Sequence, residues 1–219
     1  MNTDLNILAL DTAFGEISAC VHTAEADYFS ATLHSHGKTR STSIVPLLAE
    51  LLEKAGLSWP QLDLLALGAG PGAFTGLRIA AATLAGINSG LNLPMLHISS
   101  LAITARQCES SEPIWVLEDA RAGEAFVGCY RAGVATGEDR CLLWQEVLEM
   151  QPGSFVCHND LPVELSGWNQ QALTISRSQA LLAATLSELA TQESINLLPC
   201  YPEPIYLQRS QAEKNIDGK

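Results

Sequence analysis

The chain has 219 residues, of which 47% are hydrophobic and 16% charged, enough to bury one large core or two modest ones. The formal net charge of -12 disfavours a protein that binds tRNA or DNA by itself, because Lys and Arg supply most of the affinity for a polyanion and only 12 are present. The six cysteines are scattered without a Cys-x-x-Cys pair, and the first residues lack the basic and apolar regions of a signal peptide. We therefore expect reduced thiols and a cytoplasmic location.

The first elements in chain order are predicted strands. An apolar run from Asn6 to Leu10 is followed by two runs of β-forming residues, Ile17 to His22 and Tyr28 to Leu33. This pattern predicts three meandering strands. A polar loop then leads into a helix predicted over Thr42 to Ala55, with Gly56 as its C-cap.

A glycine-rich segment, Gly68 to Gly76, lies between a predicted strand, Leu62 to Leu67, and a predicted helix, Leu77 to Asn88. Its four glycines permit positive φ and close backbone approach, Thr75 is placed to cap the helix, and Arg78 adds a cation. Free N–H groups at a helix start bind anions, so the segment is either a phosphate-binding loop or a tight turn that packs the helix closely on a sheet. It lacks the Lys of a P-loop, which favours the tight turn.

The stretch from Ile79 to Ala105 contains no charged residue. Polar residues and Pro94 interrupt it, so neither half reaches the ~20 apolar residues of a membrane-spanning helix. A buried helix followed by a buried strand, Leu93 to Ile98, fits better. Another helix is predicted near Ser99 to Cys108.

The two halves of the chain share a pattern at an offset of 108 residues. Asp11 to Glu16 (DTAFGE) corresponds to Asp119 to Glu124 (DARAGE), and each segment follows an apolar run. Both copies predict a strand, an Asp, a tight turn with Gly-Glu and a return strand, the second over Ala125 to Tyr130. Three identities in six positions are compatible with coincidence, whereas a true duplication implies two facing domains.

The second half is less regular. Short strands are predicted over Leu142 to Leu148 and Ser154 to Cys157, and a helix over Ser178 to Gln192 with Ser178 as its cap. Three prolines between Pro199 and Pro204 then impose an extended segment.

Four segments in this order resemble the TsaB (YeaZ) family: Ile7 to Thr12, Gly70 to Ile79, Asp119 to Glu124 and Pro204 to Leu207. The resemblance spans nearly the whole chain, and the glycine segment is its most specific part. It implies an α/β fold with the two RNase-H-like lobes of the actin-like ATPase (ASKHA) superfamily, in which mixed sheets are flanked by helices. The N-terminal lobe is expected over residues 1–107 and the C-terminal lobe over 108–219.

The resemblance also implies a function. TsaB-like proteins are noncatalytic subunits that pair with the ATPase and transferase TsaD, work with the ATPase TsaE, and support formation of threonylcarbamoyladenosine beside the anticodon of tRNA. The chain is expected to contact tRNA only indirectly and to form a homodimer through the same surface. No tightly bound cofactor is expected; ATP or ADP with Mg²⁺ at the partner interface is left open.

In actin-like ATPases an Asp at the position of Asp11 lies near the metal and phosphates, because a strand-end carboxylate holds Mg²⁺ through water. For a family that resembles a degenerate ATPase, a cap on the following turn is the favoured role. Asp119 is as well placed for an ion pair with Arg121 as for a ligand. The vestigial nucleotide-binding set is Asp11, Gly70, Gly72, Thr75, Gly76 and Asp119, and no residue is assigned as catalytic or metal-ligating.

Motifs of a metal enzyme or hydrolase are absent from the sequence. The His-x-x-x-His pair that TsaD uses for its metal is missing, as are His-Glu-x-x-His and Gly-x-Ser-x-Gly; the closest histidines are His34 and His36. Two rival functions stay open. One is a nucleotide-dependent phosphotransferase or ATPase that uses Asp11, the glycine loop and Asp119, and the other is a peptidase that cleaves TsaD.

The two long helices of the first half supply the prediction of a partner surface. Apolar residues cover most of the circumference of Thr42 to Ala55, whereas facing one core needs an arc of only about 100°. Small residues on Leu77 to Asn88 permit close approach of another helix. Burial within one lobe explains both patterns equally well, and the resemblance favours pairing. The predicted interface comprises Ile44, Val45, Leu48, Leu51, Leu52, Ala81, Ala82 and Ala85.

Two positions depart from the family pattern. Thr42 occupies the place of a His found in many TsaB-like sequences. Gln208 precedes Arg209 where the family ending reads Tyr-Leu-Arg. The roles of that His and that Arg are therefore not carried over.

Overall fold

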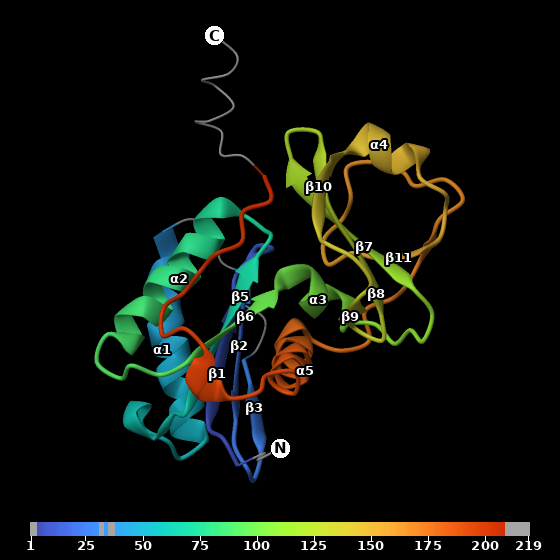
Figure 1. Ribbon diagram of the computed structural model, residues 1–219. Helices are drawn as coiled ribbons and strands as arrows, with labels where there is room; N and C mark the ends of the chain where they lie inside the picture. The colour runs from blue at the N-terminus through green and yellow to red at the C-terminus, as the bar shows by residue number, and fades with distance from the viewer. Residues whose placement is uncertain (1–3, 31–32, 35–37, 209–219) are drawn as a thin grey trace.

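Two mixed β-sheets, each flanked by helices, form the frame of the computed structural model, which describes residues 4–30, 33–34 and 38–208 (Figure 1). The first sheet has the order β3-β2-β1-β5-β6, with β4 on β2: β1 (Ile7–Asp11), β2 (Glu16–His22), β3 (Asp27–Phe29), β4 (Leu33–His34), β5 (Leu64–Gly70) and β6 (Met95–Ser99). The second has the order β10-β8-β7-β11-β12, with β9 on β8: β7 (Ile114–Arg121), β8 (Glu124–Arg131), β9 (Val134–Ala135), β10 (Arg140–Leu143), β11 (Ser154–Val156) and β12 (Asn169–Gln170).

The two sheets share one topology. In each, the first strand pairs antiparallel with the second and parallel with a later strand: β1 with β2 and β5, and β7 with β8 and β11. Gly15 and Gly123 occupy corresponding turns with φ of 96° and 81°, and Glu16 and Glu124 begin the return strands. The predicted duplication and the two-lobed α/β fold are confirmed.

The helices pack against the sheets through their apolar faces. They are α1 (Lys38–Lys54), α2 (Phe74–Asn88), α3 (Ser100–Ala105), α4 (Trp144–Glu149) and α5 (Arg177–Leu189), with short 3₁₀ turns η1 (Trp59–Gln61) and η2 (Ile195–Leu197). Alternation along β1 sends Leu8 and Leu10 toward α1 and α2, and Ile7 and Ala9 toward α5. None of the described helices is long and apolar enough to cross a membrane.

Helix α5 returns to the first lobe, although we expected it in the lobe of residues 108–219. Its side chains Leu181 and Ala184 share a core with Ile7 and Ala9 of β1. Figure 1 shows α5 beside the first sheet. Helix α5 covers one apolar face of the first sheet, and α1 and α2 cover the other. The lobes are therefore not two consecutive pieces of the chain.

Several element ends differ from the predictions because caps decide them. Helix α2 begins at Phe74 with Ala73 as N-cap, so Thr75 lies in the first turn and does not cap. Helix α5 is capped by Ser176, whose hydroxyl accepts from Gln179 N, and not by Ser178. The strand predicted from Leu142 ends at Leu143, because Glu146 accepts a hydrogen bond from Leu143 N and starts α4.

Two smaller predictions also differ from the structure, and a third is confirmed. Ser99 caps a short α3 that ends at Ala105, before the predicted end at Cys108. The run from Tyr28 to Leu33 is divided between β3 and β4. The predicted C-cap Gly56 is confirmed, with φ of 66° and the Leu57 N to Leu52 O bond of a Schellman motif.

Candidate functional site

The carboxylate of Asp11 lies at the end of β1 in a buried ion pair with Arg177, the first residue of α5. Arg177 Nε is 2.7 Å from Asp11 Oδ2, and both side chains have 0% exposed surface. Ser100 Oγ donates to the other oxygen, Oδ1, at 2.9 Å. A side chain on Gly68 would overlap this carboxylate, so the glycine at that position is needed for the close approach. Both oxygens of Asp11 are thus occupied by groups of the same chain.

The second buried acid, Glu118 on β7, lies on the other side of Arg177. Arg177 Nη1 donates to Thr104 Oγ1 at 2.9 Å, and that hydroxyl donates to Glu118 Oε1 at 3.2 Å. The backbone N–H of His158 also donates to Oε1, at 2.7 Å. Glu118 Oε2 has no hydrogen-bond partner among the described residues. Burial raises the pKa of Glu118, against the smaller opposing effect of the charge on Arg177.

The third acid, Glu16 at the start of β2, is bound by groups from both lobes. Its Oε2 is 3.3 Å from His158 Nε2, and Ser18 Oγ donates to Oε1 at 2.6 Å. Burial alone would raise the pKa of Glu16, but hydrogen bonds from His158 and Ser18 and the charges of His158 and Arg177 outweigh burial and lower it. His158 Nδ1 lies 3.0 Å from Gln107 Oε1, which is also 3.4 Å from Arg177 Nη1. These contacts form one polar network between the lobes.

The network assigns the buried acid of the second lobe that faces the first lobe to Glu118, where the repeat predicted Asp119. Side chains alternate along β7, so Ile114, Val116 and Glu118 share the face toward α3. Asp119 lies on the opposite face, half-buried, and its carboxylate is 3.3 Å from Arg121 Nη1. Of the two roles left open for Asp119, the structure shows the ion pair.

Sequence reasoning missed Glu118, His158 and Arg177. Glu118 had a detectable signal, since it is a charged residue that directly follows the apolar run Ile114 to Leu117. Arg177 had a weaker signal, because it is the only Lys or Arg between Arg140 and Arg209. Nothing in the local sequence indicates that His158 contacts both Glu16 and Gln107.

The glycine-rich segment, for which the sequence favours a tight turn over a phosphate-binding loop, is hydrogen-bonded and packed against other segments of the chain. Gly70 N donates to Ser100 Oγ at 3.2 Å, and Ala73 N donates to Ala13 O at 2.8 Å. The carbonyl of Gly76 accepts from Thr12 Oγ1 at 2.7 Å. Gly70 and Gly72 lie against backbone atoms of Ile205 and Ala13 respectively. Thr75 is exposed on the first turn of α2.

The predicted interface residues divide into two groups. Five are buried in the core between the helices and the first sheet, each at most 8% exposed: Ile44, Leu48, Leu51, Leu52 and Ala81. These five cannot contact a partner, and a charge at Leu48 would test folding instead of pairing. Three are exposed on the outer sides of α1 and α2: Val45, Ala82 and Ala85. We call these three residues, with the exposed Gly86, the helical face. Thr42 is exposed near the start of α1.

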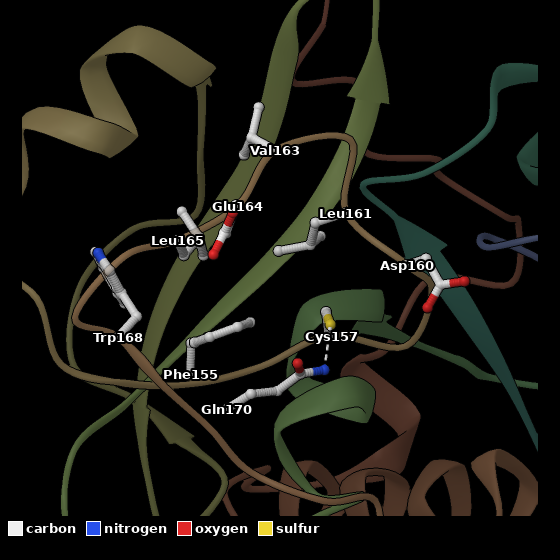
Figure 2. A pocket seen from close by; sticks show the side chains of 9 residues that line it. All are labelled: Phe155, Cys157, Asp160, Leu161, Val163, Glu164, Leu165, Trp168 and Gln170. Atoms are coloured by element: carbon white, nitrogen blue, oxygen red, sulfur yellow. Dashed lines mark hydrogen bonds between the residues drawn. The ribbon is translucent and has the colours of Figure 1, made fainter.

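The second lobe contains a pocket of about 320 Å³ between β11 and the loop that follows it. Figure 2 shows Phe155, Leu161 and Glu164 around it, with Gln170 Nε2 donating to Cys157 Sγ at 3.3 Å. Burial and the nearby negative charges of Glu118 and Asp160 raise the pKa of Cys157 to about 12. The thiol is therefore protonated at neutral pH and is a poor nucleophile.

No group of three His, Cys, Asp or Glu side chains is placed to hold a metal ion within residues 4–30, 33–34 and 38–208.

Comparisons with known proteins give consistent matches. The profile of the family described as "TsaD: tRNA N6-adenosine threonylcarbamoyltransferase" matches residues 35–150. The tRNA threonylcarbamoyladenosine biosynthesis protein TsaB of Haemophilus influenzae is 27% identical, with 99% of each chain covered. TsaB of Escherichia coli is also 27% identical, over 98% of this chain and 100% of its own. YeaZ from Pseudomonas aeruginosa has the same fold, with a TM-score of 0.69 and 23% identity over 93% of this chain and 100% of its own.

Proposed function

Because the chain belongs to the TsaD family and is similar to TsaB proteins along nearly its whole length, we propose that it acts in threonylcarbamoyladenosine biosynthesis as the noncatalytic partner of a TsaD-type transferase. A TsaE-type ATPase works with this pair, and tRNA is contacted through the partner. The net charge of -12 supports indirect contact, since it disfavours binding of tRNA by this chain alone.

The observation that carries the proposal is the helical face. The family match over residues 35–150 includes all of α1 and α2, so a TsaD-type partner has corresponding helices. Two related helix pairs can pack against each other across an approximate two-fold axis. Small residues such as Ala82 and Ala85 allow the helix backbones to approach closely. Val45, 48% exposed, is the larger apolar side chain on this face.

The noncatalytic role is supported by the occupation of Asp11. In an actin-like ATPase a carboxylate in this position serves the metal and phosphates, whereas here it is paired with Arg177 and Ser100. A nucleotide, if one is bound, is proposed to lie at the interface with the partner and not at Asp11.

The test is reconstitution with the TsaD-type subunit. Ala82→Arg places a long charged side chain on the helical face and is expected to weaken pairing by about 100-fold and to abolish tRNA modification. Ala24→Arg is the matched control, because Ala24 is exposed in the turn between β2 and β3 of the same lobe. Unchanged pairing of a folded Ala82→Arg variant would overturn the proposal. So would ATP hydrolysis by the isolated chain that Asp11→Asn abolishes.

A further inference from the structure

The segment of residues 197–207, which we call the C-terminal strap, lies alongside α2 and runs antiparallel to it (Figure 1). At one end Asn88 Nδ2 donates to Cys200 O at 2.7 Å, and at the other Ile205 N donates to Ala69 O at 2.7 Å. A Cβ on Gly70 would come within 2.6 Å of Ile205 O, so the glycine loop is shaped to receive the strap. Helix α2 is therefore flanked by α1 on one side and by the strap on the other.

Exposed apolar side chains are frequent along the whole strap and at the start of α2. In the described part of the chain ten large hydrophobic residues are exposed, and half of them lie on the strap or on the first turn of α2: Phe74, Leu197, Tyr201, Ile205 and Tyr206. Exposed side chains scattered singly need no explanation, whereas five on two adjacent segments, with Phe74 and Tyr206 in contact, indicate an interaction site.

Two of these side chains, Phe74 and Tyr206, form a stack with Arg78 at the start of α2. The rings of Phe74 and Tyr206 are 4.9 Å apart between centroids, and the Arg78 guanidinium carbon lies 3.8 Å from the centroid of Phe74. Stacking on an aromatic face leaves the N–H edge of a guanidinium available for a carboxylate. None of the ion pairs between described residues includes Arg78.

The stack continues the helical face. Phe74, Arg78, Ala82 and Gly86 follow one another at intervals of four residues, so they lie along a single stripe of α2, and all four are exposed. A partner that packs on Ala82 and Ala85 and extends one or two turns toward the start of α2 must meet Arg78 and Phe74. Tyr206, on the strap, widens the surface on the side away from α1.

We infer that the C-terminal strap and the stack of Arg78, Phe74 and Tyr206 form part of the surface that binds the TsaD-type subunit, which places a carboxylate against Arg78 and an apolar side chain against Tyr206. The inference rests on the proposed function, because it takes the occupant of the helical face as its partner. The strap lies outside the region matched by the TsaD profile, so its contacts come from this chain alone and distinguish the two subunits of the pair.

The test measures the dissociation constant for the TsaD-type subunit in four full-length variants. Tyr206→Ser and Arg78→Glu are each expected to weaken binding by about 10-fold or more, since buried aromatic and Arg contacts dominate interfaces. Tyr206→Phe keeps the ring and should bind like the parent. Arg140→Glu makes the same charge reversal at an exposed site of the second lobe and should have no effect. Circular dichroism and thermal unfolding confirm that each variant is folded.

The outcomes separate this inference from the proposed function. If Ala82→Arg abolishes pairing while Tyr206→Ser and Arg78→Glu bind normally, the strap inference is wrong and the helical face stands. If Ala82→Arg also binds normally, the proposed function itself fails. If the two stack variants alter only self-association in sedimentation experiments, a second copy of this chain is the occupant and the inference is overturned.

Discussion

Arg177 neutralises Asp11 inside the molecule, where solvent reaches neither charge. Both residues are fully buried, and each makes further hydrogen bonds that satisfy its remaining polar atoms. Removing a whole buried pair costs little or nothing when the replacements pack well, whereas removing one partner leaves a buried charge without compensation. Removing one partner should therefore destabilise the contact between α5 and β1 by more than the net contribution of the intact pair to stability.

We predict that Arg177→Met lowers the free energy of unfolding by about 3–5 kcal/mol, because Asp11 is left charged and unpaired in the core. Adding Asp11→Asn to this variant should restore a substantial part of the loss, since it removes the remaining charge. Urea unfolding of the parent, both single variants and the double variant gives the coupling energy. Losses that simply add in the double variant would contradict the prediction.

Glu16 and Glu118 should influence the pH dependence of stability with opposite signs. The folded pKa of Glu118 is raised above the ordinary value of 4.5, so the folded state keeps this proton longer and stability falls as pH rises from 4.5 through the folded pKa. The folded pKa of Glu16 is lowered, so its stabilising effect is complete above 4.5 and is lost as pH falls through the folded pKa.

Relative to the parent, Glu118→Gln should therefore become more stable as pH rises above 4.5. The loss of stability caused by Glu16→Gln should be constant above pH 4.5 and shrink below it. Urea titrations at several values between about pH 3 and about pH 8 measure both trends. Parallel pH profiles of stability for the two variants would show that the opposite pKa shifts of Glu16 and Glu118 are wrong.

At the scale of elements, the backbone conformation at helix ends differs from that on exposed helix faces. Helix α1 ends in a Schellman motif at Gly56, in the left-handed region with φ of 66°. Helix α2 has an ordinary helical glycine, Gly86, on its exposed side. A Cβ at either position would meet no atom within 4 Å, so only the backbone conformation distinguishes the two sites.

We predict opposite effects of the same substitution at these two glycines. Gly56→Ala should destabilise the chain by about 1 kcal/mol, because a side chain disfavours the left-handed conformation. Gly86→Ala should stabilise it by about 0.5–1 kcal/mol, because alanine lowers the entropy lost on helix formation. Thermal unfolding of the isolated variants at equal concentration measures both. Equal shifts of the same sign would mean that the conformations at Gly56 and Gly86 do not determine the result.

At the scale of the whole molecule, the lobes share cores as well as hydrogen bonds. One cluster combines Ala13, Phe14 and Leu77 of the first lobe with Val116 and Phe126 of the second. A second cluster places α5, which follows the second lobe in sequence, against the first sheet. The hydrogen bond between Gln208 and Glu124 links the residue after the strap to the second lobe. Interfaces of this apolar kind favour cooperative unfolding.

We predict that the two lobes unfold together. Trp59 lies in the first lobe, and the other three tryptophans, Trp115, Trp144 and Trp168, lie in the second. The fluorescence of a Trp59→Phe variant therefore reports the second lobe alone, whereas far-ultraviolet circular dichroism reports both. The two urea transitions should coincide. Separate midpoints would show that the lobes unfold independently.

Local patterns in the sequence were sufficient for much of the fold. Alternation, the glycine turns and the 108-residue repeat predicted β1, β2, β5 and β7 and the duplicated lobes, and four motif segments carried the family resemblance. These features depend on neighbours within a few residues, where backbone preferences and side-chain periodicity act directly. The exact helix starts were less accessible, because capping depends on which nearby hydroxyl or carboxylate reaches a free N–H.

Only the tertiary structure decided which of the predicted residues share a site. Whether Asp119 or Glu118 faces the other lobe depends on the face of β7 that is turned toward α3, which a one-residue change reverses. The pairing of Asp11 with Arg177 joins residues 166 positions apart, and the burial of Leu48 beside the exposed Val45 depends on how α1 lies on the sheet. The sequence by itself determined most strands and both long helices of the first lobe, indicated the repeat and carried the family resemblance. The buried polar network between the lobes, the exposed helical face and the strap beside it required the packing of distant segments, because no local preference specifies contacts over such separations.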